Sequence, residues 1–459
     1  MSELREVLAL TSSLAGEFLE SLEERPVLLD VDVEALRKAL GGSLPDGPTA
    51  PSEVVAELAR AADPGIAGTP SGRWFGFVVG GSLPAALAAD WLTSAWDQNA
   101  GLFRLAPAAS VVEEVAGEWM RDLFGLPPGV SFGFVTGCQM AHATCLAAAR
   151  NHVLAAYDWD VEREGLFGAP SVRVVAGAQR HVTIDRALRL LGFGTAAMDI
   201  VPADDQGRIV PSALRSTLDA SDGPTIVCVQ AGEVNTGAFD ALDEVAEAAE
   251  QHGAWLHVDG AFGLWAAATP ALRPLLAGVE RADSWATDAH KWLNAPYDSG
   301  IAFCRHPHSH RAAMGTSASY LVQSAEDGPR DQLDWNPEFS RRARGFAVYA
   351  ALRSLGRSGI AELVERNCAQ ARRFGEELAR LPGCQVLNHI VLNQVLFRFR
   401  TDAETDAVLA AVQASGEAWM SGTSWQGRRA VRISVSNWST SDLDVERTLH
   451  AFTAATSDR

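Results

Sequence analysis

The chain has 459 residues, of which 47% are hydrophobic and 21% charged, and this is the composition of an ordinary globular protein. Acidic residues number 57 against 38 basic ones, and the formal net charge of −19 argues against nucleic acids and anionic membrane surfaces as partners. No apolar run reaches the roughly 18 residues that a membrane span needs. The start, MSELREVLAL, carries acids where a signal peptide has a basic region. We therefore expect a cytoplasmic protein, and we expect its six cysteines, none in a C-x-x-C pair, to be reduced.

Elements taken in chain order indicate an α/β fold. Helical apolar spacing predicts helices over 3–23 and 52–62. From about residue 130, short β-branched runs alternate with helical patterns, at 131–135, 172–177, 225–232, 254–260, 284–289 and 300–305. Such alternation predicts βαβ units around a mostly parallel sheet. After residue 340 a long helical stretch leads into a smaller set of strands. We predict a helical N-terminal arm over 1–90, a large α/β domain over 91–310 and a small C-terminal α/β domain over 311–459.

Lysine is nearly absent from the chain. Only two of the 38 basic residues are lysines, Lys38 and Lys291. Lys38 lies near the end of a helical stretch before Gly41 and is typical of a solvated helix end. Lys291 lies between two predicted strands, next to His290. A reaction that needs a primary amine would therefore use Lys291, unless this lysine is simply a surface residue.

Three further features follow predicted strands, where ligands bind in open α/β sheets. The turn at Thr136-Gly137 leads into a helix whose first N–H groups could hold a phosphate, although such a glycine can also serve geometry alone. Asp259 follows a buried strand and needs a cationic or donor partner, such as a cofactor ring nitrogen, an arginine or a metal. His181 also stands at a strand end, where a helix begins. Together with Lys291, these are the parts needed to bind pyridoxal phosphate.

Two motifs, HVDGAFG at 257–263 and DAHKW at 288–292, carry a resemblance to the group II pyridoxal-phosphate-dependent decarboxylases. This family includes the aromatic-amino-acid, tyrosine, histidine and glutamate decarboxylases, and the resemblance runs from about Trp74 to about Trp438. It implies the fold of the aspartate aminotransferase superfamily (fold type I), with a seven-stranded type of sheet, and a homodimer with active sites at the interface. It further implies residue roles: Lys291 as the Schiff-base lysine, Asp259 as the partner of the pyridine nitrogen, Ala261 under the ring, His181 over it, and Gly137, Cys138, Gln139 and His290 at the phosphate.

The resemblance implies decarboxylation of an L-amino acid through the Lys291 Schiff base and a quinonoid intermediate. Phe75, Phe77 and Phe103 suggest an apolar or aromatic substrate, with some of the pocket supplied by the second subunit. Arg432 lies on a strand resembling the one from which aminotransferases bind a carboxylate. If Arg432 holds the substrate carboxylate in the plane of the cofactor ring, the site favours transamination. An aminotransferase or a decarboxylation-coupled oxidative deaminase is therefore the alternative, and a non-catalytic dimer is a third. No metal is expected.

The chain departs from the family pattern in three places. Cys138 and Gln139 replace the smaller residues commonly found at the phosphate. Asp288 stands where several relatives have an uncharged phosphate donor, so its carboxylate must point elsewhere or be paired. The loop over 322–335 contains no tyrosine to protonate the intermediate. The proton donor is then Tyr320, His181 or a residue of the second subunit.

Overall fold

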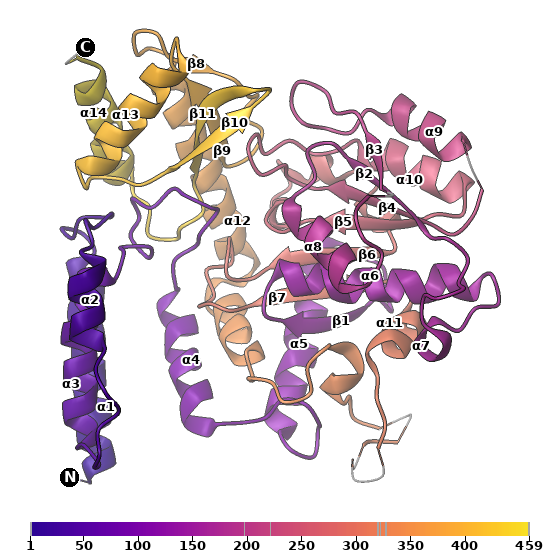
Figure 1. Cartoon of the computed structure of the whole chain (residues 1–459), viewed down its shortest axis with the longest axis horizontal. Helices are drawn as coiled ribbons and strands as arrows, with labels where there is room; N and C mark the ends of the chain where they lie inside the picture. Colours follow the sequence, from indigo (N-terminus) through magenta and orange to yellow (C-terminus); the bar gives the residue numbers. More distant parts are fainter. Residues whose placement is uncertain are drawn as a thin grey trace.

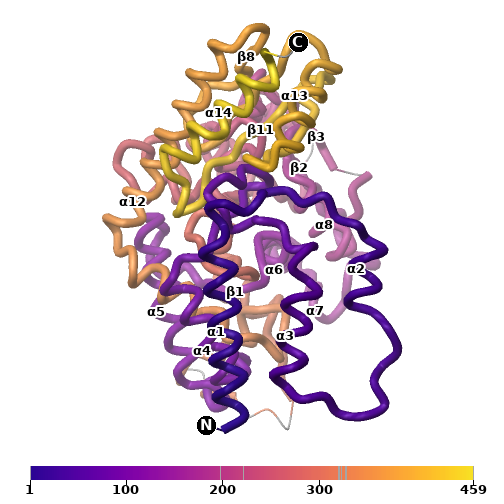
Figure 2. The backbone as a smooth tube through the Cα atoms, turned by 90° about the vertical axis from the view of Figure 1, so that its left-hand side faces the viewer, coloured from indigo at the N-terminus to yellow at the C-terminus, as the bar shows by residue number. Residues whose placement is uncertain are grey.

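The computed structural model describes residues 2–196, 198–220, 222–318, 321, 323–325 and 328–457. Its N-terminal part is helical, with α1 (Glu3–Ser21), α2 (Val33–Leu40) and α3 (Pro51–Ala62) packed on one another at one side of the molecule (Figures 1 and 2). Local sequence sets these boundaries, since Asp32 caps α2 by accepting the N–H groups of Glu34 and Ala35, and Pro51 opens α3. None of the residues of α1 is buried in the single chain.

A seven-stranded sheet forms the centre of the large α/β part, in the order β1-β7-β6-β5-β4-β2-β3. Its strands are β1 (Ser131–Val135), β2 (Arg173–Gly177), β3 (Asp199–Val201), β4 (Thr225–Gln230), β5 (Trp255–Asp259), β6 (Ser284–Asp288) and β7 (Gly300–Cys304). Only β7 runs antiparallel to its neighbours, which confirms the predicted mostly parallel sheet. The short strand β3 was not predicted.

Helices bury both faces of this sheet. Alternate residues of β4 show it, because Ile226 and Cys228 pack with α6 and α8, whereas Val227 and Val229 enter the core on the opposite face. This double burial explains why the strands read as continuous apolar runs. The helices of this part are α4 (Pro84–Trp96), α5 (Pro107–Phe124), α6 (Cys138–Ala155), α7 (Val161–Glu164), α8 (Val182–Leu190), α9 (Pro211–Asp219), α10 (Leu242–Gln251) and α11 (Pro307–Met314). Short 3₁₀ turns occur at Asp63–Gly65, Gly263–Ala268, Arg273–Leu276, Val279–Arg281 and Gln332–Trp335.

A four-stranded antiparallel sheet forms the smaller C-terminal part, in the order β10-β11-β9-β8. It contains β8 (Gln385–Val386), β9 (Gln394–Arg398), β10 (Ser421–Trp425) and β11 (Arg428–Ser434), with α13 (Asp402–Ala414) and α14 (Asp442–Ser457). The long helix α12 (Gly345–Leu378) joins the two parts and is kinked at Gly356, whose φ of 61° suits a glycine. No helix among the described residues is both long and apolar enough to cross a bilayer.

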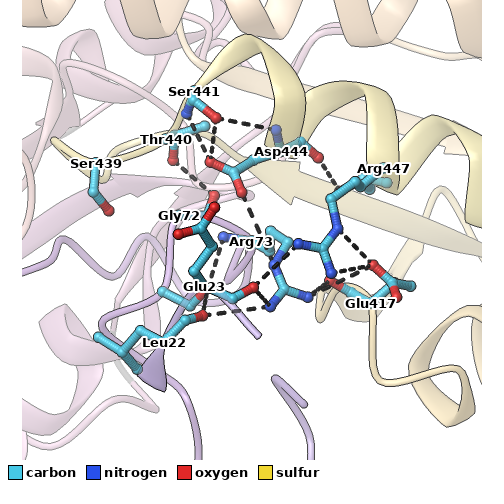
Figure 3. Close-up of polar contacts among 12 residues, drawn as sticks. Leu22, Glu23, Gly72, Arg73, Glu417, Ser439, Thr440, Ser441, Asp444 and Arg447 are labelled. Atoms are coloured by element: carbon cyan, nitrogen blue, oxygen red, sulfur yellow. Dashed lines mark hydrogen bonds and ion pairs between the residues drawn. The ribbon is translucent and has the colours of Figure 1, made fainter. Parts of the chain in front are cut away.

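Arg73 ties the N-terminal arm to the C-terminal part (Figure 3). Its side chain is 1% exposed, and its Nη2 donates to the carbonyls of Glu23 at 2.9 Å and Arg25 at 3.0 Å. Its Nη1 donates to the carbonyl of Glu417 at 2.5 Å. The carboxylates of Glu417 and Asp444 lie 3.8 and 3.9 Å from its nitrogens and balance its charge. The arm is therefore held by a buried cation rather than by apolar packing alone.

Candidate functional site

A cavity of about 510 Å³ opens at the carboxyl edge of the large sheet. The ends of β1, β4, β5 and β6 meet there, as expected for the ligand site of an open α/β sheet. Most of the residues singled out from the sequence line it: Phe77, Gly137, Cys138, Gln139, His181, Asp259, Ala261, His290, Lys291 and Arg432. Sequence reasoning missed other lining residues, among them Met140, Thr183, Gln230, Val234 and Phe262.

The turn between β1 and α6 brings backbone close to the cavity. A Cβ on Gly137 would lie 3.1 Å from Cε1 of His290, so only glycine leaves this approach free of crowding. His290 is in turn fixed, because its Nδ1 accepts the Ser299 N–H at 3.1 Å and its ring packs on Tyr297 with centroids 4.4 Å apart. The N-terminus of α6 thus faces the cavity, where its first N–H groups favour an anion.

Asp288 lies at this helix N-terminus. Its Oδ1 accepts the N–H of Cys138 at 2.6 Å, and its Oδ2 lies 2.9 Å from Nζ of Lys291. Burial disfavours the charged form of Lys291, but Asp288 together with Cys138 and Asp259 outweighs burial and raises the pKa of the lysine. The requirement that Asp288 be paired is met, and its partner is the candidate catalytic amine itself.

Asp259 ends β5 and is 6% exposed. Its Oδ1 accepts the N–H of Ala261 at 3.1 Å, and its Oδ2 lies 3.4 Å from Nε2 of His142. Burial would raise the pKa of Asp259, but His142, His181 and Lys291 together lower it below its usual range. Cys138, His142 and Asp259 each place one ligand atom within 4.8 Å of the others, a set that could also hold a metal ion.

His181 caps α8 beside the cavity. Its Nδ1 lies 3.4 Å from the N–H of Thr183, which donates to it, and 2.7 Å from the Thr183 hydroxyl. A donated backbone hydrogen requires a bare Nδ1, so the ring hydrogen of neutral His181 is on Nε2. Burial lowers the pKa of His181 and favours this neutral form.

Arg432 reaches the cavity from β11 of the small sheet. Its Nη1 donates to the carbonyl of Val234 at 3.2 Å, and its Nε has no hydrogen-bond partner among the described residues. Burial lowers its pKa, and the neighbouring Glu233 offsets this only in part. The Glu233 oxygens already accept from Asn235 and Thr236. The guanidinium of Arg432 therefore has donors left for an incoming carboxylate.

Two aromatic residues predicted in the substrate pocket do not line the cavity of the single chain. The prediction for Phe75 is wrong, because its side chain is 1% exposed and packs edge-on against Phe374 in the core of the small part. Phe103 lies outside the cavity lining, near Asp331, which accepts its N–H at 2.7 Å. Tyr320 lies outside the described residues.

The residues around the cavity fit pyridoxal phosphate. The N-terminus of α6, beside Gly137 and His290, opens on the cavity and suits the phosphate, while Lys291 neutralises the neighbouring Asp288 carboxylate. The buried, ionised Asp259 suits a protonated ring nitrogen, and Lys291 is the one lysine at the cavity. By its sheet and by these groups, the molecule is a pyridoxal phosphate enzyme of the α/β class.

Comparisons with known proteins agree. The chain matches the pyridoxal-dependent decarboxylase conserved domain over residues 34–400. It is 29% identical to tryptophan decarboxylase 1 of Oryza sativa subsp. japonica, over 95% of this chain and 90% of that protein. It is 30% identical to acidic amino acid decarboxylase GADL1 of Bos taurus, over 69% of this chain and 61% of that protein. The crystal structure of Oryza sativa TDC with PLP and tryptamine aligns at a TM-score of 0.93 and 25% identity, covering 100% of this chain and 98% of that one.

The chain belongs to the pyridoxal-dependent decarboxylase family. Its cofactor is pyridoxal phosphate, and its reaction is the decarboxylation of an amino acid. The resemblance carried by HVDGAFG and DAHKW is thereby confirmed.

Proposed function

We propose that the enzyme decarboxylates an L-amino acid with an apolar or aromatic side chain. The observation that carries this proposal is the cavity wall, where Phe77, Met140, Val234 and Phe262 offer apolar surface. Such surface favours an apolar side chain through the hydrophobic effect. Tryptophan decarboxylase 1 of Oryza sativa subsp. japonica, similar over 95% of this chain, supports the same choice.

The number of cationic groups is the second support. Arg432 is the single arginine that lines the cavity in the described part of the chain, and Lys291 is needed for the cofactor. An acidic substrate carries two carboxylates, and this wall offers only one free guanidinium for them. An apolar substrate carries one carboxylate, which Arg432 can orient when the substrate enters.

Four residues have proposed roles toward the cofactor. Lys291 supplies the amine that links it, Asp259 holds a hydrogen bond from its ring nitrogen, and His181 and Ala261 flank its ring. When bound, pyridoxal phosphate supplies an electron sink for the electron pair left as carbon dioxide departs. The chain's task is then to hold Asp259 ionised and to keep water from the reacting centre.

His181 is also the proposed proton source within the described residues. Its Thr183 contact places the ring hydrogen on Nε2, and His181 would donate that hydrogen after taking up a second proton to become the imidazolium. Tyr320 and a residue of the second subunit remain the other two candidates from the sequence.

We further propose a homodimer with active sites at the interface. Apolar side chains lie exposed on the single chain, including Trp91, Leu92 and Trp96 of α4 and Leu8 of α1. A groove of about 930 Å³ runs between α1, α4 and the start of α14. Phe77 at the active-site cavity is 60% exposed. Surfaces of this kind are typical of protein interfaces, and a second subunit would cover them.

The test of substrate class is a comparison of aromatic, aliphatic and acidic L-amino acids with the purified holoenzyme. Carbon dioxide, amine, aldehyde and keto acid are measured together. We expect amine and carbon dioxide in equal amounts, with kcat/KM highest for an aromatic or large apolar substrate. Preference for glutamate or aspartate would contradict the substrate proposal, and aldehyde or keto acid as the main product would contradict simple decarboxylation. Light scattering at several protein concentrations tests the dimer.

A further inference from the structure

A buried chain of hydrogen bonds lies behind Asp259, on the side of α6 and β5. Nε2 of His142 lies 3.4 Å from Oδ2 of Asp259, and Nδ1 of His142 lies 2.9 Å from Nε2 of His257. Nδ1 of His257 lies 2.9 Å from Oγ of Ser284, which accepts the indole N–H of Trp255 at 2.9 Å. His142, His257 and Ser284 are all 0% exposed. Such a chain is costly to bury unless each member is satisfied.

The ionised carboxylate of Asp259 fixes the direction of the chain, because it can only accept. His142 must therefore carry a hydrogen on Nε2, facing Asp259. With one hydrogen on each ring, Nδ1 of His142 accepts from Nε2 of His257, and Nδ1 of His257 accepts the hydroxyl hydrogen of Ser284. Trp255 can only donate, so it fills one lone pair of Ser284 and leaves the hydroxyl hydrogen available to His257, which agrees with this order.

Burial supports a single hydrogen on the ring of His257. It lowers the pKa of His257 to about 3, so this ring is neutral near neutral pH. Nε2 of His142 is buried and has no hydrogen-bond partner among the described residues, which leaves Asp259 as the acceptor it faces. The separation of 3.4 Å exceeds a formed hydrogen bond of about 2.9 Å, so a small rotation would close it.

We propose that Trp255, Ser284, His257 and His142 form a directed relay that presents an N–H to Asp259 and holds its carboxylate toward the cofactor ring. His142 and His257 are then positioning residues, since they act through Asp259. This inference rests on the proposed role of Asp259. Without the Ser284 hydroxyl, His257 is free to take the other tautomer, and His142 would then turn a bare lone pair toward the carboxylate.

The direct test is solid-state ¹⁵N NMR of cofactor-free protein labelled at histidine. His142→Gln and His257→Gln variants assign the two rings by loss of their signals. We expect hydrogen on Nε2 of both rings, and a change at His257 in Ser284→Ala. A bare Nε2 on His142 would overturn the relay, whatever reaction the enzyme catalyses.

The functional test compares two serines. Ser131 on β1 is also buried, and its Oγ lies 2.9 Å from Nδ1 of the buried His310, so Ser131→Ala is a matched control. Ser284→Ala should lower kcat about tenfold, the lower end of what loss of an outer hydrogen-bond partner costs at metal sites, with KM unchanged. Its bound cofactor should also show a shifted visible absorbance. Ser131→Ala should show neither effect. Equal kcat and absorbance in the two variants would overturn the relay's effect on the site.

A third variant separates this inference from the proposed function. Asp259→Asn with near-normal turnover would remove the proposed role of Asp259. The NMR result would still decide whether the relay exists in the cofactor-free chain.

Discussion

Replacing Asp288 with asparagine isolates the charge that faces Lys291. Asparagine keeps an oxygen for the Cys138 N–H but removes the negative charge 2.9 Å from Nζ. At an effective dielectric constant of about 20, the attraction across that distance is about 6 kcal/mol. Desolvation of the two charges offsets part of this attraction. A net loss of about a quarter of the attraction would already change the neutral fraction of the Lys291 amine tenfold. Asp288→Asn should therefore lower the pKa of Lys291 and expose more neutral amine at pH 7.

The assay is the rate at which pyridoxal phosphate becomes linked to cofactor-free protein, followed by visible absorbance from pH 6 to 9. Neutral amine is the nucleophile, so the variant should react at least about tenfold faster near pH 7, and the difference should shrink as pH rises. Asp283→Asn is the control, because Asp283 lies just before β6, at its other end, and pairs with His306. An equal or slower rate for Asp288→Asn would refute the reasoning, provided that the variant unfolds at a temperature similar to the control.

Three other substitutions test the site and the core. Asp259→Asn should lower kcat by about 10²- to 10³-fold while the protein still folds and binds cofactor; a loss within about threefold would make Asp259 structural. Arg432→Lys should raise KM for the amino acid roughly tenfold to hundredfold with the same product, and an unchanged KM would remove Arg432 from substrate binding. Unfolding by urea should become easier as pH falls from about 6.5 toward about 3, because unfolded His257 and His310 take up protons that the folded protein excludes. His310→Gln should flatten that pH dependence of unfolding. The same pH dependence in the variant and in the wild type would contradict a contribution from His310.

The central sheet and most of the cavity could be predicted because both rest on local signals. Strands buried on two faces give unbroken apolar runs, and Gly137, Asp259 and Lys291 each follow such a run. Strand β3 has only three residues, too few for the sequence pattern of a strand to be recognised. The limits at residues 90 and 310 stay predictions.

Residues that act through tertiary contact were the ones missed. His142 lies one turn after Cys138 on an alanine-rich helix, and His257 lies inside a buried strand, so neither position differs locally from core. The spacing of four residues between Cys138 and His142 was the available signal, because it puts both on one helix face. The prediction that Phe75 lines the substrate pocket was wrong because its aromatic side chain is equally suited to a pocket wall and to the core.

The Arg73 anchor has a consequence for how far the chain can be shortened. Its guanidinium depends on backbone oxygens of residues 22–25, which lie about fifty positions earlier in the sequence. Deleting the part of the arm up to residue 25 would leave the Arg73 cation in a solvent-poor place with several donors unmet, a larger penalty than the loss of a surface helix suggests. Added residues ahead of α1 disturb nothing at this anchor. The arm can therefore be extended at its start far more safely than it can be removed.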